Sequence, residues 1–308
     1  MKKTIGSIGL GNIGEPMALN LLQSGYSVIG FDVVEKPAFV AAGGLLAKTV
    51  AEVSKQTNLI VQSLPTVQAL ETTVDELIEF GRSGQVIIEI SSYPLKNKKL
   101  QASRLAEHGI TMLDCEISGL PFMVADRSAT IFQSGDQATI ESTQAVFEAM
   151  TNKRVNLGEF GAATKMKLLA NMMVAIHNSV AGEVLNLARK ADIDPDEVIG
   201  ALSKSAAGSV TFSNKAPIMI SREFESGAGP FRHMFSYLRR VSALAKDVGA
   251  STPLLDTIHR YYETAETEGR ADQDIAAIIE MLEAESHDKK INNASPAKEK
   301  KCPTNQPK

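Results

Sequence analysis

The fold of this chain is decided near its start, where residues 3–33 read KTIGSIGLGNIGEPMALNLLQSGYSVIGFDV. The short apolar run at 3–9 is followed by apolar residues at helical spacing over 13–24, and then by a second apolar run at 27–33. Runs of this length predict buried strands, and Gly25 fits the end of the helix between them. The order strand, helix, strand predicts two parallel strands joined by a helix.

The turn between the first strand and the helix has the spacing G-x-G-x-x-G. Gly9 permits a tight turn, Gly11 lets a phosphate group approach the backbone, and Gly14 lets the helix pack closely on the strand. The amide groups at the start of the helix then face the phosphates. The predicted cofactor-binding turn consists of Gly9, Leu10, Gly11, Asn12, Ile13 and Gly14.

Asp32 ends the second strand, 18 residues after Gly14. An acid at about this distance from the turn reaches the adenosine ribose of a bound dinucleotide. Its carboxylate binds the ribose diol and repels a 2′-phosphate, so we predict NAD as the cofactor, with NADP possible. The alternative interpretation is an exposed acid with no ligand.

The alternation of strand and helix patterns continues to about residue 160. Short apolar runs predict strands, and helical spacing predicts the segments between most of them. Such alternation predicts an α/β domain with a mainly parallel sheet covered on both faces. The further predicted strands are 58–65, 85–91, 110–117 and 128–135, and the predicted helices are 37–42, 66–80, 94–108 and 136–150.

Beyond residue 160 the strand patterns stop. One nearly unbroken helix is predicted at 162–190, and only helical patterns follow it, at 195–204, 210–219, 231–248, 251–268 and 271–286. We therefore predict a dinucleotide-binding domain at 1–160 and an all-α substrate and oligomerisation domain at 161–285. The polar, lysine-rich residues 286–308 lack periodicity and predict a disordered tail.

The composition excludes several classes of function. The net charge is −4 without a basic block in the folded region, so nucleic acid and anionic membranes are not expected partners. No long uncharged apolar run predicts a membrane span. The five histidines form no metal-like cluster, so no metal is expected. Two distant cysteines, Cys115 and Cys302, fit a reducing, cytoplasmic compartment.

Several segments resemble the β-hydroxyacid dehydrogenase family, which includes 3-hydroxyisobutyrate dehydrogenase and the tartronate semialdehyde reductases. The turn and helix at 9–21 resemble G-x-G-x-M-G-x-x-M-A-x-N-L, with Met17, Ala18, Asn20 and Leu21 in register. IEISSYP (88–94) is similar to I-D-x-S-T-x-x-P, DCEISG (114–119) to D-A-P-V-S-G, and GAATKMKLLANMM (161–173) to the segment with the catalytic lysine. The resemblance covers about residues 3–285.

This resemblance implies a Rossmann-type domain, an all-α domain, an active site between them and a homodimer or homotetramer. It implies that Leu64, Pro65, Ser91 and Ser92 lie near the cofactor. It also implies that Ser118 and Gly119 hold the carboxylate of a small substrate. The implied activity is hydride transfer between a nicotinamide cofactor and a small hydroxy acid or its semialdehyde or keto form.

Two lysines, Lys165 and Lys167, compete for the catalytic position in the long helix. At about 100° per residue, Lys167 and Asn171 lie about 40° apart on one face, whereas Lys165 lies about 120° from Asn171. The family motif likewise has its asparagine four residues after the lysine. We therefore predict Lys167 as the acid or base and Asn171 as its partner, with a packed surface lysine as the alternative.

The predicted chemistry gives this lysine a use. Oxidation of a hydroxy acid moves a proton off the hydroxyl, and reduction polarises and protonates the carbonyl oxygen. A lysine can do either when its pKa falls from about 10.4 toward neutrality. Asn171 can donate and accept hydrogen bonds without titrating, so it would orient the lysine or the substrate.

Three departures from the family pattern leave other functions open. Leu120 stands where the substrate loop has a second glycine, which changes the predicted pocket. Ser236-Tyr237 replaces a Lys-Asp pair that supports the cofactor, and Ala170 precedes Asn171 where many members have two asparagines. Glu89 also replaces the usual aspartate of the segment at 88–94. One alternative is reduction of another C=O or C=N group, as in imine reductases. The other is a nucleotide-binding scaffold without turnover.

Overall fold

The computed structural model describes residues 4–225 and 229–292, and only the backbone of 287–292. It divides into two compact units, 1–172 and 173–308. These units separate inside the long helix α9 (Ala162–Lys190), and the predicted domain boundary near residue 160 stays a prediction. Of the predicted tail, residues 286–292 continue the last helix, and 293–308 lie outside the described residues.

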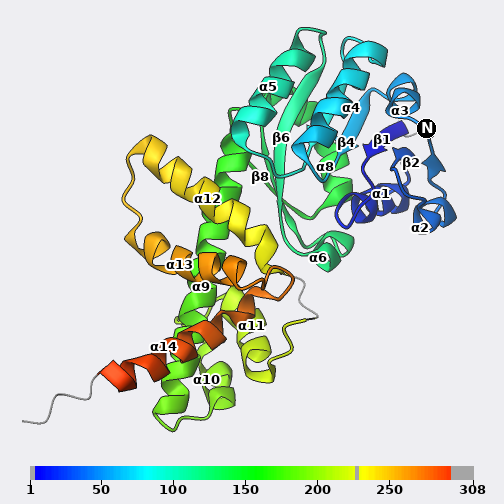
Figure 1. The fold of residues 1–308 in the computed structure, drawn as a ribbon. Coiled ribbons are helices and arrows are strands. Elements are labelled where there is room, and N and C mark those ends of the chain that lie inside the picture. The colour runs from blue at the N-terminus through cyan, green and yellow to red at the C-terminus, as the bar shows by residue number, and fades with distance from the viewer. Residues whose placement is uncertain (1–3, 226–228, 293–308) are drawn as a thin grey trace, which may run out of the picture. The chain divides into compact units, whose positions relative to one another are not determined.

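The first unit contains an eight-stranded sheet in the order β3-β2-β1-β4-β5-β6-β7-β8 (Figure 1). Every neighbouring pair is parallel except β6 and β7. The predicted, mainly parallel sheet is confirmed. The strands are β1 (Thr4–Ile8), β2 (Ser27–Phe31), β3 (Leu45–Leu46), β4 (Leu59–Gln62), β5 (Val86–Glu89), β6 (Thr111–Ser118), β7 (Thr130–Ser134) and β8 (Lys153–Asn156).

The two strands at the edges of the sheet, β3 and β8, have no counterpart among the predicted strands. Both residues of β3 are exposed, and β8 has no buried residue. Edge strands that pack on no core lack the apolar run that marks a buried strand. The sequence therefore revealed the six strands that bury apolar side chains and missed the two that do not.

Helices cover both faces of the sheet, which explains why its central strands are apolar throughout. Ile5 of β1 packs with Met17, Leu21 and Phe147 on one face, and Ile8 packs with helical residues on the other. The helices of this unit before α9 are α1 (Gly14–Gln23), α2 (Pro37–Ala41), α3 (Val50–Gln56), α4 (Val67–Phe80), α5 (Leu95–Ala106), α6 (Pro121–Ala125), α7 (Gln137–Ser142) and α8 (Gln144–Met150).

The strand order reverses at β1, which has β2 on one side and β4 on the other. In open parallel sheets, ligands bind outside the carboxyl ends of the strands at such a switch point. The predicted turn at 9–14 follows β1, and Leu64-Pro65 follows β4. The topology therefore brings these two predicted segments to the same place.

The second unit consists of helices around an aromatic core. Phe231 and Tyr262 make an edge-to-face contact with ring centroids 5.5 Å apart. Lys215 forms a salt bridge of 2.6 Å with the buried Asp274. Tyr237 is one of the two residues that replace the family's Lys-Asp pair, and the guanidinium of Arg240 lies over its ring. After α9, the helical segments are α10 (Pro195–Leu202), α11 (Val210–Ser221), α12 (Phe231–Val248), α13 (Pro253–Thr267), the 3₁₀ helix η1 (Ile275–Ala277) and α14 (Ile278–Asn292).

Among the described helices, α9 alone is long and apolar enough to cross a membrane by length and composition. In its most apolar window 44% of the residues are buried, and a buried core helix passes the same test. This property therefore carries no conclusion about a membrane.

Candidate active site

The glycine turn after β1 is shaped by two close backbone approaches. Gly9 has a φ of 83°, which glycine adopts without steric cost. A Cβ at Gly9 would overlap the carbonyl oxygen of Ser63, and a Cβ at Gly14 would overlap that of Gly9. Gly11 has open space around it. The first and third glycines therefore serve packing, and Gly11 leaves room for a ligand against the backbone.

The start of α1 is open to an anion. Its N-cap residue is Ile13, whose side chain makes no capping hydrogen bond. Amide groups in the first turn of a helix lack partners within the helix and bind phosphate well. Leu10 and Asn12 lie in the turn that leads into these amides.

Asp32 lies beside the glycine turn, as its spacing predicted. Its Oδ2 accepts a hydrogen bond from the Leu10 amide (2.7 Å), and its Oδ1 accepts one from the Val34 amide (2.9 Å). The Lys36 ammonium lies 3.6 Å from Oδ2. Lys36 was not among the predicted site residues, although an i, i+4 acid–base pair is visible in the sequence.

The segments after β4 and β5 are joined by hydrogen bonds. The Leu64 amide donates to Ser91 Oγ (2.7 Å), and the Tyr93 hydroxyl donates to the Leu64 carbonyl (2.7 Å). Leu64-Pro65 and Ser91 were predicted near the same ligand from different segments, and the structure brings them into contact. Ser92 instead donates to Glu116 Oε1 (3.2 Å), toward β6.

Glu89, at the end of β5, holds the Ser91 segment through a hydrogen bond. The fully buried carboxylate accepts the Ser91 amide (2.6 Å) and the Gln62 side-chain amide (2.5 Å). Burial raises the pKa of Glu89 to about 7, although the charge of Lys98 and these hydrogen bonds act in the opposite direction. The Glu89 carboxyl group therefore changes its charge near neutral pH while it is hydrogen-bonded to the Ser91 amide.

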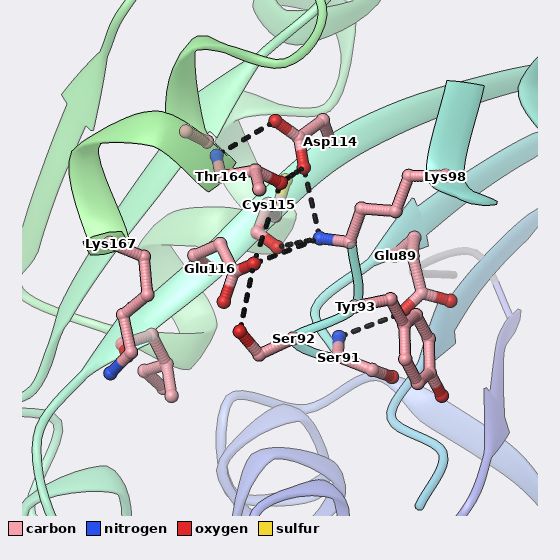
Figure 2. Close-up of polar contacts among 12 residues, drawn as sticks. Glu89, Ser91, Ser92, Tyr93, Lys98, Asp114, Cys115, Glu116, Thr164 and Lys167 are labelled. Atoms are coloured by element: carbon pink, nitrogen blue, oxygen red, sulfur yellow. Dashed lines mark hydrogen bonds and ion pairs between the residues drawn. The ribbon is translucent and has the colours of Figure 1, made fainter. Parts of the chain in front are cut away.

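A buried lysine that the sequence analysis missed lies at the centre of this region (Figure 2). Lys98 of α5 is fully buried. Its Nζ donates to Asp114 Oδ1 (2.9 Å), the Cys115 carbonyl (3.0 Å) and Glu116 Oε1 (3.3 Å). Burial alone would lower the pKa of Lys98, but the carboxylates of Glu116 and Asp114 raise it above its ordinary value.

Asp114 connects this ion pair to the start of α9. Its Oδ2 accepts the Thr164 amide (3.0 Å) and the Ser134 hydroxyl (3.0 Å), and its Oδ1 accepts the Thr164 hydroxyl (2.7 Å). Ser134 Oγ in turn accepts the Ala163 amide (3.0 Å). Burial would raise the pKa of Asp114, yet the Lys98 charge and the Thr164 hydrogen bonds hold it below its ordinary value. Two first-turn amides of α9 are thus capped from β6 and β7.

One helical turn after Thr164, Lys167 contacts the end of β6, where the predicted substrate-binding residues Ser118 and Gly119 lie. The Lys167 ammonium donates to the Ile117 carbonyl (2.7 Å), immediately before Ser118 and Gly119 at the end of β6. Lys167 is half-buried, whereas Lys165 is exposed. This difference in exposure agrees with the positions around the helix that favoured Lys167 over Lys165.

Asn171 lies on α9 one turn beyond Lys167 and is 7% exposed. Its Nδ2 atom has no hydrogen-bond partner among the described residues. A buried amide nitrogen without a partner costs free energy, and a bound ligand would remove that cost. Among the side chains that the structure describes, in residues 4–225 and 229–286, no group of three or more histidine, cysteine, aspartate or glutamate residues could hold a metal ion.

The missed residues left a weak signal in the sequence. Lys98 stands seven residues before Leu105, so it shares the buried face of α5, but the polar stretch around it suggested a solvated helix. Asp114 and Glu116 alternate within a strand whose inner six residues are buried. Two carboxylates in such a strand indicate a buried cation, although the sequence does not say which one.

Comparison with known proteins assigns the chain to a family. Residues 4–158 match the sequence model of the NAD binding domain of 6-phosphogluconate dehydrogenase. Residues 161–282 match that of the NAD-binding domain of NADP-dependent 3-hydroxyisobutyrate dehydrogenase. The chain belongs to the β-hydroxyacid dehydrogenase family. It is an NAD(P)-dependent oxidoreductase acting on CH–OH groups, as the sequence predicted.

Individual members of the family are distant relatives of this β-hydroxyacid dehydrogenase. The glyoxylate/succinic semialdehyde reductase 2 of Arabidopsis thaliana is 25% identical, over 91% of this chain and 80% of the relative. A probable mitochondrial 3-hydroxyisobutyrate dehydrogenase of Dictyostelium discoideum is 27% identical, over 91% of each chain. The structure of Mycobacterium tuberculosis 3-hydroxyisobutyrate dehydrogenase with L-serine aligns with a TM-score of 0.81, at 24% identity, over 92% of this chain and 99% of that one.

The dehydrogenase should lose stability as pH rises through the range in which Glu89 ionises. Between pH 4.5 and about 7 the folded state keeps the Glu89 proton that the unfolded chain has lost. The free energy of unfolding therefore falls with rising pH, by about 3 kcal/mol at 1.36 kcal/mol per pKa unit. Glu89→Gln stays neutral and should lack this decline in urea unfolding at pH 5, 6 and 7. The exposed Glu79→Gln is the matched control, and parallel curves for Glu89→Gln and wild type would contradict the assignment.

Proposed function

We propose that this enzyme transfers a hydride between a nicotinamide cofactor and a small carboxylate-bearing hydroxy acid, or its semialdehyde or keto form, with Lys167 as acid and base. The observation that carries the proposal is the hydrogen bond of 2.7 Å from Lys167 to the Ile117 carbonyl, next to Ser118 and Gly119. The relatives' names, which refer to glyoxylate, succinic semialdehyde and 3-hydroxyisobutyrate, support a substrate that carries a carboxylate.

The carboxylate of the substrate would bind at the end of β6. The Ser118 hydroxyl and the Gly119 amide can both donate hydrogen bonds to an anion. A Cβ at position 119 would come within 2.7 Å of Ala129 Cβ, so only glycine fits without movement there. Binding at this point would bring the adjoining carbon of the substrate toward Lys167.

Lys167 would act on the oxygen of the reacting carbon. In reduction, the ammonium donates a proton as the carbonyl oxygen becomes a hydroxyl, and in oxidation the neutral amine accepts that proton. The bond to the Ile117 carbonyl uses one N–H group and orients the ammonium. Asn171 would donate its unpartnered amide nitrogen to the substrate, and its amide oxygen would accept from the Lys167 ammonium. The nicotinamide, when bound, supplies or accepts the hydride.

The cofactor would lie along the glycine turn, with its pyrophosphate against Gly11 and the open start of α1. The Leu64 amide donates a hydrogen bond of 2.7 Å to Ser91 Oγ. We assign these two residues, together with Pro65 and Ser92, to the nicotinamide end of the site. Asp32 favours NAD, because its carboxylate repels a 2′-phosphate. The Lys36 ammonium lies 3.6 Å from Asp32 Oδ2. If this ion pair separated, Lys36 would bind the 2′-phosphate of NADP.

The loop after Gly119 supports a substrate that differs from those of the relatives. Leu120 replaces the second glycine of the family motif, and the exposed Phe122 and half-buried Met123 follow in α6. These apolar side chains favour a larger or less polar substrate than the smallest hydroxy acids. Reduction of a C=N group remains the enzymatic alternative, and a nucleotide-binding scaffold is the non-enzymatic one. The lysine at 167 argues against both.

The assembly is proposed as a homodimer or homotetramer formed through α9. Met173, Val180 and Leu187 follow one another at seven-residue spacing and are each about half exposed or more. Seven residues complete almost two helical turns, so the three side chains form one apolar stripe. A second copy of the chain is the partner that such a self-complementary stripe fits. A cytoplasmic location is proposed as well, which the free thiol of Cys115 supports.

Lys167→Ala should lower kcat at least 100-fold in an assay of hydroxy acids and semialdehydes with NAD(H) and NADP(H), because general acid–base catalysis contributes about 10²–10⁴-fold. Lys165→Ala is the matched control, since Lys165 is exposed two residues away on the same helix. Full activity in Lys167→Ala would refute the assignment of this lysine. An absence of turnover in wild type with every substrate, together with cofactor binding, would favour the scaffold.

Calorimetric titration should show tighter binding of NADH than of NADPH to the wild-type enzyme. Lys36→Ala should leave NADH binding nearly unchanged and weaken NADPH binding further, because it removes the cation next to Asp32. Tighter NADPH binding by wild type, lost in Lys36→Ala, would instead assign the preference to Lys36. If neither nucleotide bound, the proposed cofactor site would be wrong.

Val180→Lys and Leu187→Lys should each shift the enzyme toward a smaller species in sedimentation velocity, because a lysine in an apolar interface must lose its hydration. The matched control is Glu197→Lys, an exposed change in α10 away from the stripe. A wild-type enzyme that sediments as a monomer at all concentrations would overturn the proposed assembly.

A further inference from the structure

Gln62 and Glu89 form a buried side-chain pair for which the proposed reaction has no assigned use. They are the last residues of the neighbouring strands β4 and β5, they lie opposite each other in the sheet, and both are fully buried. The side-chain amide nitrogen of Gln62 donates to Glu89 Oε2 (2.5 Å). Hydrogen bonds to a charged acceptor are stronger than those between neutral groups, so this bond joins the ends of the two strands inside the core.

This pair closes a ring of hydrogen bonds around the two segments that follow the strands. Two residues beyond each member of the pair, the Leu64 amide donates to Ser91 Oγ (2.7 Å). The Ser91 amide in turn donates to Glu89 Oε1 (2.6 Å), as Figure 2 shows. The backbone from Leu64 back to Gln62 completes the ring, so displacement of one segment breaks a bond to the other.

The length of the Glu89 side chain allows it to bond to both segments. An aspartate, the usual residue of the family motif at this position, commonly accepts the amide two residues further along the chain. Glu89 makes that bond to Ser91 with one oxygen, and its second oxygen reaches Gln62 on the next strand. An ionised carboxyl group accepts through both oxygens, so this one side chain holds both segments.

Tyr93 adds a further bond between the same two segments. Its hydroxyl donates to the Leu64 carbonyl (2.7 Å), so both backbone groups of Leu64 are bonded to residues of the 91–93 segment. These segments are the ones assigned to the nicotinamide end of the cofactor. The adenosine end is assigned instead to the glycine turn and Asp32, which take no part in the ring.

We propose that Gln62 and Glu89 are positioning residues for the nicotinamide end of the cofactor and act through the Leu64 and Ser91 segments. This inference rests on the proposed function, which assigns those segments to the cofactor. Both side chains are fully buried, so their effect passes through the segments and not through contact with the ligand. A surface that is held in its binding geometry before the ligand arrives binds more tightly, because less has to be ordered.

Two ligands distinguish the two ends of the cofactor site. NADH carries both ends, whereas ADP-ribose lacks the nicotinamide. Gln62→Leu and Glu89→Leu each remove the bond between the side chains with little change in volume. In calorimetric titration at about pH 8, we expect each variant to bind NADH about tenfold more weakly than wild type, as for loss of a buried hydrogen bond. Binding of ADP-ribose should stay within about twofold of wild type, because its contacts lie outside the ring.

The double variant Gln62→Leu/Glu89→Leu tests whether the two residues act as one unit. It should bind NADH no more weakly than Glu89→Leu alone, because effects within one hydrogen-bond network do not add. If the losses of the single variants add in the double variant, the two residues do not act as a pair.

Two further variants control the experiment. Glu89→Asp can still accept the Ser91 amide but is too short to reach Gln62, so its affinity for NADH should be intermediate. It also provides a result if the leucine variants do not fold. Glu79→Leu, an exposed change in α4, is the matched control and should bind both ligands as wild type does.

The outcomes separate this proposal from the proposed function. A wild-type enzyme that binds neither ligand would refute the assigned cofactor site itself. Unchanged NADH affinity in the folded Gln62 and Glu89 variants would overturn the positioning role and leave the cofactor site standing. Equal losses of NADH and ADP-ribose affinity would overturn it as well, because the pair would then support the whole site and not one end. Turnover does not enter these measurements, so a failure of the acid–base role of Lys167 would leave them unaffected.

Discussion

The buried ion pair between Lys98 and Asp114 is the interaction on which the active-site region depends. Removing two charges from water costs several kcal/mol per ion, and the cost is offset only when geometry and hydrogen bonds are good. Lys98 meets this condition with three oxygen acceptors, and Asp114 does so with hydrogen bonds from Thr164 and Ser134. If either partner were lost, the other would remain as an unpaired buried charge.

The ion pair matters for chemistry because it fixes one helix against one strand. Asp114 holds Thr164 at the start of α9, and three residues further along both elements the Ile117 carbonyl holds Lys167. These two contacts determine the rotation of α9 and its position along β6. The proposed acid–base role of Lys167 needs such a fixed helix, since a small displacement of a catalytic group can cost about 100-fold in rate.

Further charged side chains lie around this framework. Glu89 and Glu116 place two additional titrating groups beside the Ser91–Ser92 segment and Lys167, and Lys36 places a cation beside Asp32. Glu89 and Glu116 are accommodated within the regular pairing of β5 and β6. The fold is that of a β-hydroxyacid dehydrogenase, and these charged groups lie beside its predicted cofactor and substrate segments.

The sequence by itself determined what depends on neighbours along the chain. Apolar runs located the buried strands, glycine spacing predicted the tight turn beside Asp32, and helix phase predicted that Lys167 is less exposed than Lys165. Only the tertiary structure decided that Lys98 is buried and that Asp114 caps a helix 50 residues away. Such contacts join distant segments and leave no periodicity in the sequence. For the same reason the exposed edge strands β3 and β8, which form by backbone pairing alone, became visible only in the folded chain.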